Sequence, residues 1–241
     1  MDFLEMPGGW ETPSDDEFDA AKQRTLSALA HPKLSNYYDR TKNYAGTSFW
    51  AMGDNPSHDL VPADLLAVTL MSVEVMPHGV RAMLNDGPMR ERSIALLAKV
   101  PSERTLENAT ADDLVAAFDF HRAVKLAIAN PGAASSNPWV TASKLTARKR
   151  PLLIPVRDNV VGGVLGKRAV KYAGVYWQLM RALLIDPEIK QAMMAARDRV
   201  TSQLGDDVQS HFDQEPDLRL LDAALWISAV HAAVAEEKPA K

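Results

Sequence analysis

Basic side chains are concentrated in one stretch of a chain that is acidic overall. The net charge is −4, yet residues 144–171 hold eight Lys and Arg residues and a single acid, Asp158. Lys and Arg contact the phosphate oxygens of nucleic acids, and Lys144 and Arg148 are four residues apart, on one face of a helix. We therefore predict a nucleic-acid-binding surface with DNA as the candidate partner, and an ordinary solvated basic face is the alternative. The predicted contact residues are Lys144, Arg148, Lys149, Arg150, Arg157, Lys167 and Arg168.

Asp158 is the candidate catalytic group, because it is the lone carboxylate of this basic window. A carboxylate at the start of a helix can activate water, or stabilise a positive charge that develops nearby. The neighbouring Arg157 favours the ionised form that either role requires. The same position also suits a purely structural helix N-cap, so the sequence leaves both roles open.

Several common kinds of catalytic and metal site are missing from the sequence. The chain has no cysteine, which excludes disulfides, thiolate catalysis and Cys-ligated zinc. Its six histidines are isolated and form no His-x-His or His-Glu-x-x-His pattern. Residues 162–168 have the wrong spacing for a phosphate-binding P-loop, and Arg168 stands where that motif needs Ser or Thr. We predict neither a metal nor a cofactor.

Helices are the elements that must position these residues. Apolar residues recur at helical spacing from Ser14 to Ala235, whereas the best strand candidate, 152–154, is followed at once by Pro155. We predict a mainly α fold, with a compact multi-helix domain over 15–235 in one body or in two helical lobes. The expected helices cover residues 14–30, 62–74, 89–99, 110–129, 139–149, 159–165, 168–185, 187–203 and 216–235.

Two further acids have structural interpretations. Thr110 with Asp113 three residues later has the pattern of a capping box at the start of a helix. Asp222 lies in an apolar stretch and is expected to pair with Arg219 or with a basic residue of 144–150.

Both ends of the chain differ from this helical body. Residues 1–20 contain seven acids and no Lys or Arg. We interpret 1–14 as an acidic mobile leader whose Trp10 can dock on the body, and 236–241 as a polar tail. The acidic start is unlike a secretory signal, and no apolar run approaches the ~18 residues of a membrane span. We expect a cytoplasmic protein with no membrane partner, in keeping with the lack of cysteine.

Three segments together resemble a bacterial protein family of unknown function. They are residues 64–68 (DLLAV), residues 129–161 and residues 220–226 (LLDAALW). The resemblance extends over most of 37–230 and implies no established activity.

The middle segment also resembles the helix-hairpin-helix DNA glycosylase superfamily. Thr141-Ala142 matches the start of the helix after the hairpin. Pro155-Val156 and Asp158 match the family's link and acid, with Arg157 as an extra residue. The resemblance implies a hairpin whose amides bind a phosphate, and a carboxylate, Asp158, that serves base excision.

The segment departs from that superfamily at the hairpin. Asn137, Pro138 and Trp139 stand where glycines are expected, and proline cannot donate an amide hydrogen bond. Val140 occupies the place of the lysine of lyase-type members, so lyase chemistry is not implied. One hypothesis is a DNA-binding protein of glycosylase-like architecture, active in base excision or inactive. The other is a non-enzymatic helical module that binds a protein, with the acidic leader and basic window as complementary surfaces.

Overall fold

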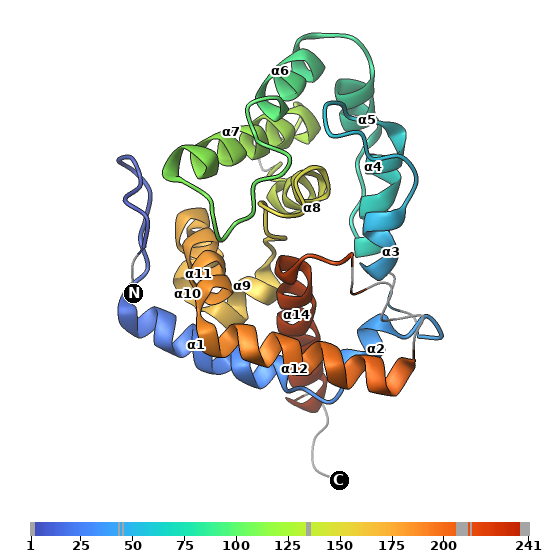
Figure 1. Ribbon diagram of the computed structural model, residues 1–241. Helices are drawn as coiled ribbons and strands as arrows, with labels where there is room; N and C mark the ends of the chain where they lie inside the picture. Colours follow the sequence, from blue (N-terminus) through green and yellow to red (C-terminus); the bar gives the residue numbers. More distant parts are fainter. Residues whose placement is uncertain are drawn as a thin grey trace. The chain divides into compact units, whose positions relative to one another are not determined.

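The chain folds into helices, as the sequence predicts. The computed structural model shows helix and no strand in the part of the chain that it describes (Figure 1). Two compact units form, which corresponds to the two-lobe version of the prediction. Unit 1 combines Met1–Tyr44 with Arg157–Lys241, and unit 2 is Ala45–Val156. The described residues are 3–42, 44, 46–133, 136–205, 212 and 214–236.

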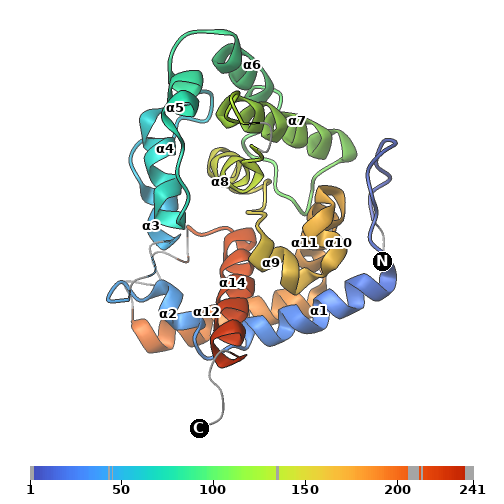
Figure 2. The same ribbon diagram turned by 180° about the vertical axis from the view of Figure 1, so that it is seen from behind.

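The helices of unit 1 surround the last helix of the chain. They are α1 (Asp15–Leu29), α2 (Leu34–Tyr38), α9 (Asn159–Leu165), α10 (Lys167–Lys171), α11 (Ala173–Ile185), α12 (Pro187–Leu204) and α14 (Asp217–Glu236). α14 contacts α1, α2, α9, α11 and α12, and α1 lies beside α12 (Figures 1 and 2). Leu220, Leu221 and Leu225 of α14 are completely buried. Burial of these apolar side chains is the main stabilising contribution to the unit.

The helices of unit 2 are organised around its longest one. They are α3 (Gly46–Ala51), α4 (Pro62–Ala67), the 3₁₀ helix η1 (Val68–Met71), α5 (Pro77–Leu84), α6 (Pro88–Leu97), α7 (Ala111–Ile128) and α8 (Trp139–Lys149). α7 contacts α5, α6 and α8. α5 approaches α7 closely at Gly79, where an added Cβ would lie 3.2 Å from Ile128. A side chain there would require Ile128 to shift slightly, so the small size of glycine suits this close contact.

Side-chain caps fix several helix starts that the sequence predicts. Thr110 and Asp113 form the expected capping box at the start of α7. Ser14 and Glu17 form another at the start of α1. Asp186 accepts from two amides at the start of α12. Caps of this kind each contribute about 1 kcal/mol, so the polar sequence signals at these sites are structural.

The structure corrects three details of the predicted helices. The helix expected over 168–185 is interrupted at Tyr172, whose backbone is extended between α10 and α11. The helix expected over 62–74 becomes 3₁₀ at Val68 and ends before Ser72, which has a left-handed backbone. α2, α3 and α5 were not predicted, because they are only five, six and eight residues long, too short for a repeated helical period in the sequence.

Two expectations concern the membrane and the end of the chain. Among the described helices, none has the combined length and apolar character needed to cross a bilayer. The predicted polar tail lies, after Glu236, outside the described residues.

Candidate anion-binding surface

The basic residues of α8 are buried and do not form the predicted positive surface. Relative exposure is 7% for Lys144, 0% for Arg148 and 3% for both Lys149 and Arg150. Their charged groups donate to main-chain carbonyls and to polar side chains of unit 2. The prediction that these four residues form an exposed patch is therefore wrong.

Asp64 lies at the centre of this buried cluster. Its Oδ1 accepts from Nε of Arg148 at 2.9 Å, and its Oδ2 accepts from Nζ of Lys149 at 2.9 Å. Oδ2 also accepts from the amide of Val61, which caps α4. Burial lowers the pKa of Lys149, and the Asp64 carboxylate opposes that shift. One carboxylate thus compensates two cations that water does not reach.

Some of the other donors of these residues bind carbonyls at the C-terminal ends of helices. Nζ of Lys144 donates to the carbonyl of Met71, the last residue of η1, at 2.7 Å. Nη2 of Arg150 donates to the carbonyl of Leu97, the last residue of α6, at 2.8 Å. Arg148 reaches carbonyls at the end of α3. Such carbonyls lack intrahelical donors and carry partial negative charge, so α8 fastens three helix ends.

Asp158 begins α9 in unit 1, whereas α8 belongs to unit 2. Its Oδ1 accepts from the amide of Val161 at 2.8 Å, and the residue is 8% exposed. The N-cap role is therefore confirmed, and the catalytic role stays a prediction. The guanidinium of Arg157 donates to the carbonyl of Val170 at 2.5 Å, and burial lowers its pKa.

The most exposed of the predicted basic residues is Lys167 on α10, while Arg157 and Arg168 are partly buried. Lys167 and Lys171 are exposed and lie one turn apart, and the side chain of Arg168 is 39% exposed. The charged ends of Arg168 and Lys171 lie 5.7 and 4.8 Å from the ring centre of Tyr172. Exposed Arg24 of α1 is joined to the same region by a 2.8 Å hydrogen bond to the carbonyl of Val164. We call the set Arg24, Lys167, Arg168 and Lys171 the α10 surface.

Acidic side chains from the N-terminal segment already bind this surface. Nη2 of Arg168 lies 2.9 Å from Oε2 of Glu11, and Nη1 lies 2.7 Å from Oε2 of Glu17. The carbonyl of Thr12 accepts a further hydrogen bond from Nη1 at 3.3 Å. The α10 surface therefore takes carboxylates, while Lys167 and Lys171 stay exposed beside them.

The acidic leader is held in place by packing as well as by charge. Trp10 packs edge-on against Trp177 of α11, with ring centres 6.3 Å apart, as the predicted docking of Trp10 requires. Gly174, in the first turn of α11, lies directly under the leader. An added Cβ on Gly174 would lie 2.9 Å from the carbonyl oxygen of Glu11 and from the Trp10 ring. This close approach lies directly after the break between α10 and α11. The absence of a side chain at Gly174 is what lets the leader reach the helix.

A second polar network is buried in unit 1. Arg219 pairs with Asp222 at 2.7 Å, which confirms the first of the two predicted partners. The carboxylate of Glu215 accepts from the hydroxyl of Tyr38 at 2.9 Å. Burial raises the pKa of Glu215 to about 7, although the Tyr38 hydrogen bond and the charge of Arg197 oppose the shift. Glu215 is thus a carboxyl group that titrates near neutral pH.

The remaining sequence hypotheses concern metals and the hairpin. Within the described residues, no group of three or more His, Asp or Glu side chains is placed to hold a metal ion. α7 ends at Ile128 and α8 begins at Trp139, and the start of α8 has no side-chain cap. The helix-hairpin-helix resemblance is not confirmed.

Comparison with known proteins gives a family but no activity. No curated protein and no solved structure shows significant similarity to this chain. A family model described as "Family of unknown function (DUF6308)" matches residues 30–229, which include all the helices described above except α1 and the end of α14. The chain belongs to the DUF6308 family, whose function is unknown.

Proposed function

We propose that the protein binds the phosphate backbone of DNA through the α10 surface. The observation that carries this proposal is the pairing of Arg168 with the carboxylates of Glu11 and Glu17, because phosphate oxygens have the same charge and acceptor geometry. Lys167 and Lys171 extend the positive charge along one face of α10. Tyr172 offers an aromatic ring beside the cations, as nucleic-acid-binding surfaces commonly do.

The proposal requires contacts with the DNA phosphate backbone and no catalysed reaction. Base excision by Asp158, the narrower hypothesis, needs in addition that this capping carboxylate acts on a flipped nucleotide. A cytoplasmic location is part of the proposal. Binding that depends on a few phosphate contacts is weak, independent of sequence and sensitive to salt.

Removing the two exposed lysines tests this proposal. For each phosphate contact, the binding constant varies with salt concentration to the power of about −0.9. Lowering the salt from 1 M to 0.1 M therefore raises the affinity about eightfold per contact. Lys167→Ala/Lys171→Ala should therefore weaken binding of a labelled 20-base-pair duplex on the order of 50-fold at 0.1 M salt, measured by fluorescence anisotropy.

The matched control is Lys33→Ala/Lys190→Ala, which removes two exposed lysines elsewhere in unit 1. It should bind like the unmodified protein. Equal losses in the two double variants would mean that net charge, and not the α10 surface, governs binding.

Releasing the leader should strengthen binding, because Nη2 of Arg168 then loses its Glu11 partner and becomes available to phosphate, while Glu17 of α1 keeps its bond to Nη1. Gly174→Ala puts a methyl group against Trp10 and the Glu11 backbone without changing any charge. We expect affinity at 0.1 M salt to rise by up to about eightfold, the contribution of one more contact. Limited proteolysis within residues 3–14 should become faster in the same variant.

Gly163→Ala is the control for this second experiment, because an added Cβ there meets nothing within 4 Å. It should change neither affinity nor proteolysis. Faster proteolysis in Gly174→Ala without tighter binding would show that the leader does not compete with DNA for Arg168.

A further inference from the structure

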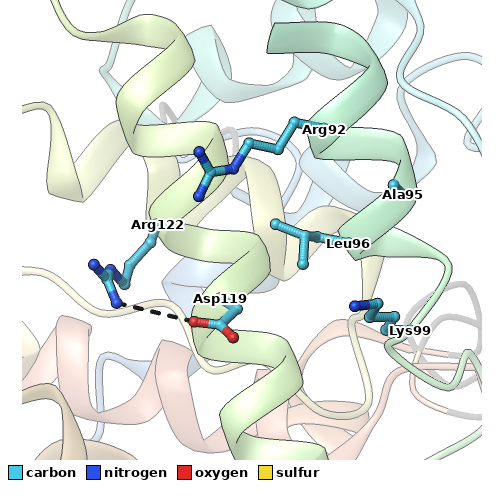
Figure 3. A pocket seen from close by; sticks show the side chains of 6 residues that line it. All are labelled: Arg92, Ala95, Leu96, Lys99, Asp119 and Arg122. Carbon is cyan, nitrogen blue, oxygen red and sulfur yellow. Dashed lines mark ion pairs between the residues drawn. The ribbon is translucent and has the colours of Figure 1, made fainter. Parts of the chain in front are cut away.

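A groove between α6 and α7 in unit 2 is lined by exposed cations and apolar side chains. Its volume is about 330 Å³. Figure 3 shows Arg92 reaching from α6 toward α7, Arg122 and Asp119 together on α7, and Lys99 at the other end of the α6 wall from Arg92. Asp119 lies 4.0 Å from Arg122, and both side chains are about half exposed or more. The lining residues are Arg92, Ala95, Leu96, Lys99, Asp119 and Arg122.

Apolar residues continue the groove beyond the two arginines. Met89 precedes Arg92 by three residues on α6, and Leu126 follows Arg122 by four residues on α7, so each lies one turn further along the same helix face. Figure 3 shows that the two helices run in opposite directions, which places both turns at the same end of the groove. Met89 is 39% exposed and Leu126 is 50% exposed. Apolar side chains and cations therefore alternate along α6, from Met89 through Arg92 and Leu96 to Lys99, and on α7 the cation Arg122 is followed by apolar Leu126.

We propose that this groove binds an acidic amphipathic helix of a protein partner. An amphipathic helix offers apolar anchors at helical spacing with charged residues between them, which matches the alternation along α6 and α7. The groove carries three cations and one acid, so a partner with Glu or Asp between its anchors complements it. Residues 89–99 span about 15 Å at helical rise, which corresponds to a partner helix of about ten residues.

A nucleic acid fits this groove less well than a peptide. A phosphate backbone has no apolar surface to cover Met89, Leu96 and Leu126. Two exposed acids lie along the chain after the Lys99 end of the groove. Glu103 is in the segment that joins α6 to α7, and Asp112 is in the first turn of α7. Those acids would repel a polyanion that continued past this end. The surface is also separate from the α10 surface, so the two proposals stand independently.

A synthetic peptide provides the test. The probe is a 14-residue amphipathic helix with Leu at positions i, i+4 and i+7 and Glu between them, and the control peptide is the same composition in scrambled order. We expect the helical peptide to bind the full chain at least tenfold more tightly than the scrambled one, by isothermal titration calorimetry. Equal binding of the two peptides would overturn the proposal.

Three variants locate the site. Arg92→Gln/Arg122→Gln removes two cations and should weaken binding of the helical peptide at least tenfold. Leu126→Ser removes an apolar contact and should weaken binding of the same peptide several-fold. Arg81→Gln, which removes an exposed cation of α5 in the same unit, should leave it unchanged. Loss of DNA binding in Arg92→Gln/Arg122→Gln, with peptide binding retained, would assign the groove to nucleic acid and contradict the proposal.

Discussion

Asp64→Ala is expected to lower the free energy of unfolding by about 3–5 kcal/mol, the usual loss when one partner of a buried ion pair is removed. The side chains of Asp64, Arg148 and Lys149 have no exposed surface. Without the carboxylate, two cations would be left in the interior of unit 2 with fewer acceptors than donors. Urea unfolding followed by circular dichroism measures the loss.

Asp59→Ala is the matched control, because it also removes an aspartate that pairs with an arginine of unit 2. Asp59 lies 2.7 Å from Arg90, but its side chain is 33% exposed. An ion pair that water reaches contributes about 1 kcal/mol or less, so the loss should be clearly smaller. Equal losses would contradict the claim that burial makes the α8 cluster important for stability.

Unit 1 should lose stability as the pH rises toward neutrality, because of Glu215. Burial raises the pKa of this carboxyl to about 7 from its usual value of 4.5, so the folded state binds the proton more tightly than the unfolded state. The stability from this proton is fully present below pH 4.5 and is lost as the pH rises through about 7. A shift of this size corresponds to about 3 kcal/mol at most.

Glu215→Gln separates this effect from the other groups that titrate, because the amide keeps the shape of a protonated carboxyl and carries no charge. The pH dependence of urea unfolding should be flatter for this variant than for the unmodified protein between pH 4.5 and 8. The relevant neighbours, Tyr38, Tyr37, Arg197, Arg219 and Asp222, are the same in both proteins. Parallel pH profiles would show that Glu215 ionises normally.

The sequence predicts the fold class because helical periodicity and capping residues are local signals. The Ser14 and Thr110 caps and most long helices follow from them. The break at Tyr172 does not, and directly after it Gly174 packs against Trp10 and Glu11 from a distant part of the sequence, a contact that no local pattern reveals. Short helices such as α2 and α3 also escape prediction, since their stability comes from tertiary contacts and not from their own residues.

The candidate site was only partly predictable, because charge in a sequence does not reveal burial. Arg148 and Lys167 have equal weight in the basic window, yet one is completely buried and the other exposed. One signal was present: Asp64 stands beside the apolar residues of a predicted helix, and a buried carboxylate needs a cationic partner. Its partner lies 84 residues away along the chain, and no local pattern identifies it.

The salt dependence of DNA binding tests the central claim most directly. With two exposed lysines as phosphate contacts, a plot of log K against log salt concentration should have a slope of about −1.8 for the unmodified protein. Gly174→Ala, which frees Nη2 of Arg168 from Glu11, should steepen the slope to about −2.7, and Lys167→Ala/Lys171→Ala should bring it close to zero. A slope that is the same in all three proteins would contradict binding through the α10 surface.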